Sequence, residues 1–319
     1  MTKKTQRETN PFKFSNSNKR YHTFDYDLKS LFGEKVGKVS LDAGFTCPNI
    51  DGAAGYGGCI YCLGGSSGAE AGETLSEQYE KGADVMRRKW RCERFIPYLQ
   101  AHTNTYAAVS RLKEIYKECA SFEGAVMLAI ATRADCLEDD KIALISEISE
   151  KIPVMVELGL QSIHDETATL INRGHTFSCF EKAFEKLKGA QGNIKTTVHL
   201  INGLPGESVG DMVESARVVG QMHPDVIKFH LLHVLKGTKL AEMYHAGEYE
   251  PMVMEDYVKV VCDQLEVVPG DIAVGRVTGD GRADDLLAPL WSMKKTAVAN
   301  EIDKELYRRG SYQGYRLNN

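Results

Sequence analysis

Apolar and polar positions along this chain follow two periods, which predict strands and helices in turn. Short, nearly continuous apolar runs are typical of strands covered on both faces of a sheet. They occur at 38–42, 95–100, 125–131, 154–160, 196–201 and 226–232. Apolar residues at helical spacing lie between them, at 74–90, 105–120, 138–150, 164–188 and 207–222. This alternation predicts an α/β protein in which six βα units form a partial (β/α)6 barrel.

Two extensions flank the predicted barrel. We assign residues 1–35 to an N-terminal extension, 36–235 to the barrel core and 236–319 to a C-terminal helical extension, because the regular alternation fades after about residue 235. Helical patterns near 255–267 and 296–309 indicate that the last segment packs on the barrel as helices. Functional residues of such barrels gather at the C-terminal ends of the strands.

The composition is that of a folded globular protein, with 43% hydrophobic and 26% charged residues in 319. No apolar run approaches the roughly 20 residues of a membrane span, and the opening residues lack the apolar stretch of a secretion signal. We therefore expect a cytoplasmic protein without a membrane partner. Six Lys and Arg stand against one Glu in residues 1–20, and six against three acids in residues 291–319. These basic ends fit either arms for a polyanion or ordinary solvated termini.

Three of the eight cysteines lie together in a Gly-rich segment, FTCPNIDGAAGYGGCIYCLGG, which directly follows the first predicted strand. They are Cys47, Cys59 and Cys62. Glycines such as Gly52 and Gly64 supply backbone angles that let a loop fold around a compact object. The other five cysteines are scattered singly, and those in helical patterns are expected to pack as small apolar residues.

The count of three cysteines favours an iron–sulfur cluster. A structural zinc ion takes a closed set of four ligands, whereas three thiolates can hold a [4Fe–4S] cluster with one iron left open. Tyr61, just before Cys62, is placed to shield such a cluster. A zinc site and a dithiol redox site are the alternatives at this point.

The cysteine spacing and several longer segments resemble the radical S-adenosylmethionine (SAM) enzymes. The spacing is C-x11-C-x2-C in place of the family's common C-x3-C-x2-C. It is similar to the radical-SAM domain of the Elongator catalytic subunit and especially to the YtqA/YhcC-like group. The similarity runs from about residue 20 to 245 and is carried by RYHTFDYDLKSLFGEKVGKVSLDAGFTCPN, QAHTNTYA, ATRADCL, VELGLQSIHDETATLINRGHT, HLINGLPGE and KFHLLHVLKGT. It implies a partial (β/α)6 radical-SAM barrel with N-terminal and C-terminal extensions.

The resemblance implies a [4Fe–4S] cluster and SAM as cofactors, and an electron donor such as flavodoxin or ferredoxin as a partner. SAM would bind the open iron, and the reduced cluster would cleave it to methionine and a 5′-deoxyadenosyl radical that abstracts a substrate hydrogen. Thr103 and Asn104 lie where the family contacts the methionine end of SAM. Gln161 and Arg173 match residues that hold SAM, with Arg173 suited to pairing its carboxylate. A capping or pairing role on a helix surface is the alternative for both.

The later strands supply the remaining candidates. In HLINGLPGE, the resemblance implies that His199, Gly203 and Leu204 lie against the adenine. Glu157 is an acid within a buried strand, where burial is costly without a partner, so we expect a role at the SAM site or a salt bridge. Weaker candidates for substrate contacts lie in the sixth strand and just after it, and they are His230, His233 and Lys236. Satisfied barrel histidines and a solvated loop lysine are the alternatives for these three.

The substrate is implied by the resemblance. The tail ELYRRGSYQGYR interleaves tyrosines with arginines, which suits base stacking and phosphate contacts, although a frayed helix end also accounts for it. The Elongator subunit acts on the wobble uridine of tRNA. The implied reaction is the conversion of 5-carboxymethylaminomethyl-(2-thio)uridine to 5-aminomethyl-(2-thio)uridine in tRNA. Two alternatives stay open, a radical SAM enzyme acting on a small metabolite and a non-enzymatic iron–sulfur or zinc protein that binds nucleic acid. The oligomeric state is open.

Overall fold

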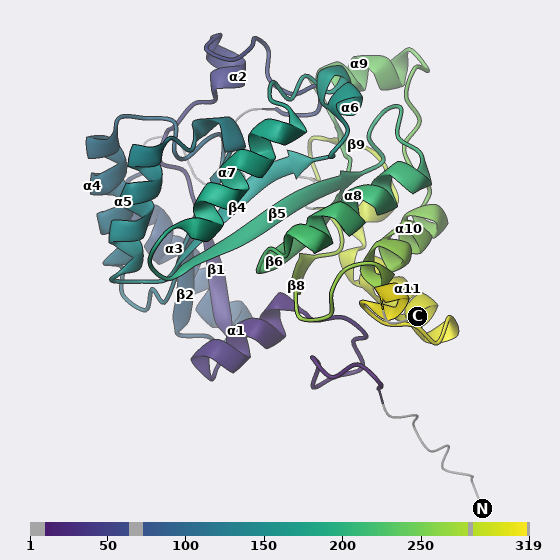
Figure 1. Cartoon of the computed structure of the whole chain (residues 1–319), viewed down its shortest axis with the longest axis horizontal. Helices are drawn as coiled ribbons and strands as arrows, with labels where there is room; N and C mark the ends of the chain where they lie inside the picture. The colour runs from purple at the N-terminus through teal and green to yellow at the C-terminus, as the bar shows by residue number, and fades with distance from the viewer. Residues whose placement is uncertain (1–9, 64–72, 280–282, 318–319) are drawn as a thin grey trace, which may run out of the picture.

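The computed structural model describes residues 10–63, 73–279 and 283–317. A curled sheet of seven parallel strands forms the centre of this part of the chain, in the order β1-β2-β3-β4-β5-β6-β8 (Figure 1). The strands are β1 (Val36–Leu41), β2 (Arg94–Leu99), β3 (Leu128–Thr132), β4 (Val154–Gln161), β5 (Ile194–Asn202), β6 (Val226–Leu231) and β8 (Ala273–Arg276). The six predicted strands and the partial barrel are confirmed. The seventh strand, β8, comes from the segment assigned to the C-terminal extension.

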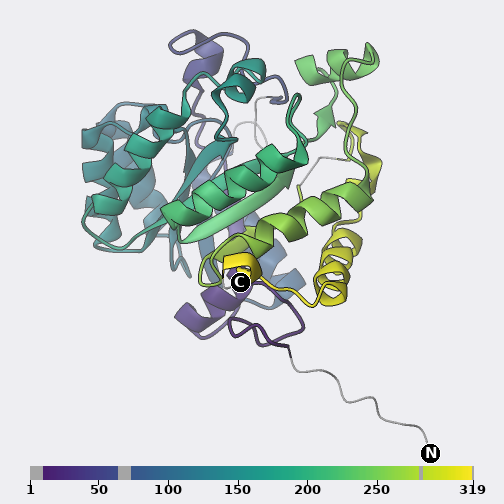
Figure 2. The same ribbon diagram turned by 45° about the vertical axis from the view of Figure 1, so that its right-hand side comes forward.

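Helices that connect successive strands lie along the outer face of the sheet (Figure 2). They are α3 (Leu75–Trp90), α4 (Val109–Ala120), α5 (Asp139–Ser149), α7 (Phe177–Gly189) and α8 (Val209–Met222). The short helix α6 (Asp165–Leu170) lies instead at the C-terminal end of β4 (Figure 1). Thr74 and Ser208 each form a capping box at the start of α3 and α8, which satisfies backbone N–H groups that a helix leaves without partners.

The single helix expected over 164–188 is wrong, because two helices occupy that range. Asn172 and Gly174 between them have φ angles of 54° and 86°, and the left-handed region is incompatible with a continuing right-handed helix. The resulting turn carries residues that contact the cysteine loop, as shown below.

The main hydrophobic core lies between the outer face of the sheet and the helices. Leu112, Tyr116, Phe180 and Phe184 from α4 and α7 are fully buried there. A second cluster, which includes Ile96, Met127 and Met155 from the strands, packs against Leu28 of the N-terminal helix. This second cluster packs on the inner side of the sheet, toward the N-terminal ends of the strands.

The N-terminal segment closes the curled sheet on the side of β8. Thr23 forms a parallel bridge with Val274 of β8, and the Val274 N–H donates to the His22 carbonyl at 2.6 Å. Helix α1 (Phe24–Phe32) follows directly and contacts both β8 and β1. The first described residues therefore cover the gap between the two edge strands.

The C-terminal part covers the sheet and completes it. Besides β8, it contains the short antiparallel pair β7 (Val234–Leu235) and β9 (Leu286–Ala288). It also contains the helices α9 (Lys239–His245), α10 (Met254–Glu266) and α11 (Lys295–Arg308). Helix α10 packs between α8 and α11. No helix among the described residues is long and apolar enough to cross a membrane.

Candidate active site

The three loop cysteines line one cavity of about 220 Å³ at the C-terminal ends of the strands; we call it the cysteine cavity. Cys47 precedes the one-turn helix α2 (Pro48–Asp51), and Cys59 and Cys62 follow in the same loop. Gly57 and Gly58 have φ angles of 78° and 73°, a region that glycine adopts without steric cost. These glycines turn the chain just before Cys59. Gly64 lies outside the described residues.

Two asparagines, which sequence reasoning missed, tie the cysteine loop to the turn after α6. The Asn49 amide is fully buried and donates to the Asn172 carbonyl at 2.5 Å, with Cys59 Sγ 3.8 Å away. Asn172 in turn donates to the Gly58 carbonyl at 2.7 Å. Side-chain amides that bind backbone groups in both directions hold two loops in register. The only sequence signal was the position of Asn49 two residues after Cys47.

The surroundings of the cysteines fit a metal cluster. Burial raises the pKa of the Cys59 thiol and raises the pKa of Tyr61, whose hydroxyl lies against Cys59, well above its ordinary value. A buried thiol loses its proton readily only when a positive centre is bound. The three sulfurs surround a cavity, and among the described residues no three His, Cys, Asp or Glu are placed to hold a single metal ion. Three thiol donors around a cavity are a suitable ligand set for a [4Fe–4S] cluster.

Several other predicted site residues line the cysteine cavity, namely Tyr61, Thr103, Glu157, Gln161, Arg173 and His199. Thr103 is fully buried, and its Oγ1 has no hydrogen-bond partner within the described part of the chain. A buried hydroxyl without a partner is costly, so this group is available to a bound ligand.

Gln161 ends β4 in a left-handed conformation with φ of 65°, next to a register irregularity in the pairing of β4 with β5. This conformation costs a non-glycine residue roughly 1–2 kcal/mol, and such strain is concentrated at functional sites. Gly159 makes room for the side chain, because a Cβ there would come within 2.6 Å of Gln161 Nε2. The backbone thus turns the amide of Gln161 toward the cavity wall.

Arg173 is buried, and its guanidinium is already engaged by backbone carbonyls. It donates to Ser162 at 2.6 Å, to His175 at 2.8 and 3.0 Å, and to Leu160. Leu160 and Ser162 flank Gln161, so Arg173 holds the strained turn in place. This geometry favours a positioning role over the expected pairing with a SAM carboxylate. Arg133, which sequence reasoning did not single out, also lines the cavity and donates to the Arg173 carbonyl at 2.8 Å.

The remaining predicted residues lie outside the lining of the cysteine cavity. Asn104 is buried and donates to the Ala131 carbonyl at 3.0 Å, which fixes the loop after β2. Gly203 and Leu204 line a separate cavity beside α10. Lys236 is exposed and donates to the Asp284 carbonyl at 2.6 Å. His233 is half-buried and belongs to neither the cysteine cavity nor the larger one described next.

A second cavity of about 660 Å³ occupies the inside of the curled sheet; we call it the inner cavity. Its lining includes Lys38, Tyr98, Lys228, His230 and Arg276, which come from four different strands. His199 lines both cavities. The two cavities therefore meet at His199, within β5.

Glu157 lies where the two cavities meet and is held by four side chains. Its carboxylate accepts from Lys228 at 2.5 Å, Tyr98 at 2.6 Å, Lys38 at 2.7 Å and His199 at 3.0 Å. Burial alone would raise its pKa, but the charges of Lys228 and Lys38 hold the pKa of Glu157 well below its usual range. The expected salt bridge is present, and the acid lines the cysteine cavity as well.

The histidine beside Glu157 is neutral at pH 7. Burial, together with the charge of Lys228, lowers the pKa of His199 to about 4. A neutral imidazole has one N–H, and the contact with an ionised carboxylate places that hydrogen on Nε2. His199 also stacks on His230, with ring centroids 5.0 Å apart.

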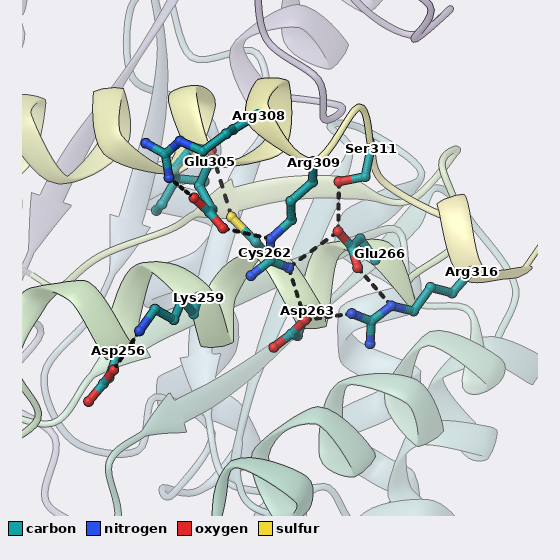
Figure 3. Close-up of polar contacts among 11 residues, drawn as sticks. Asp256, Lys259, Cys262, Asp263, Glu266, Glu305, Arg308, Arg309, Ser311 and Arg316 are labelled. Carbon is teal, nitrogen blue, oxygen red and sulfur yellow. Dashed lines mark hydrogen bonds and ion pairs between the residues drawn. The ribbon is translucent and has the colours of Figure 1, made fainter.

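The arginines of the C-terminal tail are bound to acidic residues of the same chain (Figure 3). Arg309 pairs with Asp263, Glu266 and Glu305, and Arg316 pairs with Asp263 and Glu266. Arg308 pairs with Glu305. The carboxylates of α10 and α11 thus already pair with these arginines, and the expectation that the tail contacts RNA phosphates stays a prediction. Lys3, Lys4 and Arg7 of the basic N-terminus lie outside the described residues.

Comparison with known proteins agrees with this arrangement. The protein YtqA of Bacillus subtilis (strain 168), described as uncharacterized, is 44% identical over 96% of this chain and 96% of its own length. The tRNA uridine(34) acetyltransferase of Methanocaldococcus infernus is 28% identical over 58% of this chain and 34% of its own length. Among solved structures, the archaeal Elp3 of Methanocaldococcus infernus with an N-terminal deletion has a TM-score of 0.67 at 20% identity, covering 87% of this chain and 64% of that chain.

Two family models match most of the chain. Residues 224–308 match the radical SAM C-terminal domain, and residues 55–219 match the radical SAM superfamily. Members of this superfamily use a [4Fe–4S] cluster and SAM, as predicted. The resemblance to the YtqA-like group is confirmed too. With its curled parallel sheet and its cysteine cavity at the strand ends, the chain belongs to the radical SAM superfamily.

Proposed function

We propose that this radical SAM enzyme modifies the wobble uridine of tRNA and converts 5-carboxymethylaminomethyl-(2-thio)uridine to 5-aminomethyl-(2-thio)uridine. The observation that carries the proposal is the junction of the cysteine cavity with the larger inner cavity at Glu157 and His199. A site for the cofactors thus adjoins a cationic space for a substrate. A match of 28% identity over 58% of this chain to a tRNA uridine(34) acetyltransferase supports tRNA as the substrate.

In this proposal, Cys47, Cys59 and Cys62 hold the cluster. When it is bound and reduced by a flavodoxin or ferredoxin, the cluster supplies the electron that cleaves SAM to methionine and a 5′-deoxyadenosyl radical. Thr103 orients SAM through its hydroxyl, which has no partner among the described residues. Gln161 does so through its side-chain amide, which a strained backbone conformation holds at the cavity. Arg173 holds the turn that carries Gln161. Tyr61 covers the cluster on the side of Cys59.

The reaction balances with SAM as the oxidant. The hydrogen removed comes from the methylene of the carboxymethyl group, where the adjacent nitrogen stabilises the radical. Two-electron oxidation of the C–N bond gives an imine, and the same two electrons reduce one SAM to 5′-deoxyadenosine and methionine, with release of one proton. The single electron from the donor is therefore recovered in each turnover. Addition of water to the imine releases glyoxylate and leaves the aminomethyl group on the base. The released proton passes to solvent water, and Glu157 holds the neutral imidazole of His199 in place between the two cavities.

A second candidate substrate is a small metabolite. The internal pairing of the tail arginines favours it, because an RNA-binding surface normally keeps its cations accessible. The volume of the inner cavity, about 660 Å³, is within the range of ordinary small-molecule sites. Both candidates use the same cofactor site.

One experiment separates the two candidates. The anaerobically reconstituted holoenzyme is incubated with SAM, a reductant and tRNA that carries 5-carboxymethylaminomethyluridine labelled with deuterium at the methylene. We expect deuterium in 5′-deoxyadenosine, glyoxylate in solution and a 5-aminomethyl nucleoside in the tRNA. The nucleoside profile of tRNA from cells that lack the gene provides the matching test. If the labelled tRNA neither stimulates SAM cleavage nor changes mass, the tRNA proposal is wrong.

A further inference from the structure

The inner cavity is lined by more positive than negative charge. Lys38, Lys228 and Arg276 line its walls, and Lys295 lies at its rim. Asp25 is the only acid among the described residues that line it, and it already pairs with Lys29 and Lys35 outside the cavity. The cavity therefore suits a negatively charged group.

Glu157 beneath the cavity shares its single negative charge between two of these cations, Lys38 and Lys228. The Lys228 side chain is 8% exposed. Burial of a positive charge without a full counter-charge is costly. Burial, followed by the repulsion of Lys38, lowers the pKa of Lys228 to about 7 despite its contact with Glu157. The unbound cavity thus carries a cost that a bound anion would relieve.

Two polar groups at the cavity have no partner. Thr278 lines the cavity and is 8% exposed, and its Oγ1 has no hydrogen-bond partner within the described residues. His230 also lines the cavity, and its Nε2 likewise has no hydrogen-bond partner within the described residues. Since buried polar groups are normally satisfied, these two groups, each able to donate a hydrogen bond, and the cations on three strands form a site suited to an acceptor.

We infer that the inner cavity binds the carboxylate of the substrate, with Lys38, Lys228 and Arg276 as its cationic contacts and Thr278 as a neutral donor. The inference deepens the proposed function and rests on it for the identity of the substrate, because the carboxymethyl group carries such a carboxylate. The carboxylate then lies on the inner side of Glu157 and His199. This placement directs the neighbouring methylene toward the cysteine cavity, where SAM binds.

The test compares two nucleosides that differ only in this charge, 5-carboxymethylaminomethyluridine and its carboxamide. Binding to the holoenzyme with SAM is measured by calorimetry at fixed ionic strength. We expect the carboxylate to bind at least tenfold more tightly than the carboxamide. At pH 8, its binding also takes up protons as Lys228 becomes charged again. The ratio should approach one in Lys38→Met and in Arg276→Met. Lys186→Met, on the outer helix α7 and paired with Asp139, should keep the ratio of the parent protein.

Further variants and ligands separate the outcomes. Replacing Lys228 alone would take one of its cationic partners from the buried carboxylate of Glu157, so Lys228→Met is combined with Glu157→Gln. Circular dichroism checks the fold of every variant. Equal affinity for the two nucleosides in the parent protein overturns the inference. Competition by inorganic phosphate as strong as that of the carboxylate assigns the cavity to an RNA phosphate and overturns it too. Selective binding of the carboxylate without conversion of the modified tRNA leaves the inference standing and rejects the proposed function.

Discussion

Arg309, which caps the C-terminal end of α11, donates to Asp263 on α10 at 2.9 Å, and the same guanidinium contacts Glu266 at 3.3 Å. Carboxylates from two helices thus converge on one half-buried arginine, whose pKa is raised by its hydrogen bond to Glu305, although burial works against this rise. The contact joins the last helix to the helix that packs on α8. It therefore bears on stability more than on ligand binding.

Replacing Arg309 by Gln should lower the free energy of unfolding by about 1.5–3 kcal/mol, because hydrogen bonds to charged groups are worth roughly that amount. Arg308→Gln is the matched control, since Arg308 is exposed and pairs only with Glu305 among the described residues, and it should change stability by less than about 0.5 kcal/mol. Denaturant unfolding measures both. A loss of tRNA affinity in Arg309→Gln at unchanged stability would reinstate the tail as an RNA surface.

Replacing Cys47, Cys59 or Cys62 by Ala should remove the visible absorption of the reconstituted cluster and all SAM cleavage. The reason is that each of the three supplies one thiolate to the cluster. Cys92→Ala serves as the control, because Cys92 is buried beside Met86 and far along the chain from the cysteine loop. Iron analysis and the absorption spectrum provide the measurement. Full iron content in a variant that lacks all three cysteines would refute the ligand assignment.

Gln161 and Arg173 should respond differently to substitution. Gln161→Ala should weaken SAM binding about three- to tenfold, the effect of one hydrogen bond, with little change in thermal stability. Arg173→Gln should lower the free energy of unfolding by more than about 2 kcal/mol, because it leaves the carbonyls of Leu160 and His175 without donors. Calorimetry with SAM and thermal unfolding separate the two effects. The reverse pattern would make Arg173 the direct SAM contact.

Acid should destabilise the fold through its buried histidines. The pKa of His199 is about 4 in the folded protein and about 6.5 in an unfolded chain, so unfolding takes up a proton between these values. Stability is complete above pH 6.5 and falls as the pH drops toward 4, by up to about 1.4 kcal/mol per pH unit for one histidine. His175 and His233 act in the same direction. His199→Gln should therefore flatten the dependence of the unfolding free energy on pH between 6.5 and 4.5. An unchanged slope would contradict a neutral His199.

The sequence predicted the strands well, because each is a continuous apolar run bounded by turn residues. It predicted the cysteine loop because the ligand residues are close together in the chain. It did not predict β8, which is only Ala273–Arg276 and is recognisable as a strand only through its pairing with β6. It did not predict the pairing of the tail arginines for a related reason, since the acids that contact Arg309 and Arg316 lie on α10. Composition reveals charges, whereas their partners follow from tertiary contacts.

The bridge between Thr23 and Val274 has a consequence for biosynthesis. A ribosome makes residues 20–32 early, but their partner strand β8 emerges only when most of the chain has been made. Until then, β6 is an open sheet edge and the N-terminal segment has nothing to pair with. Unpaired edges are templates for aggregation in nascent chains. A polypeptide terminated before residue 273 would therefore present an unprotected edge, and it would depend on chaperones in a way that the finished protein does not.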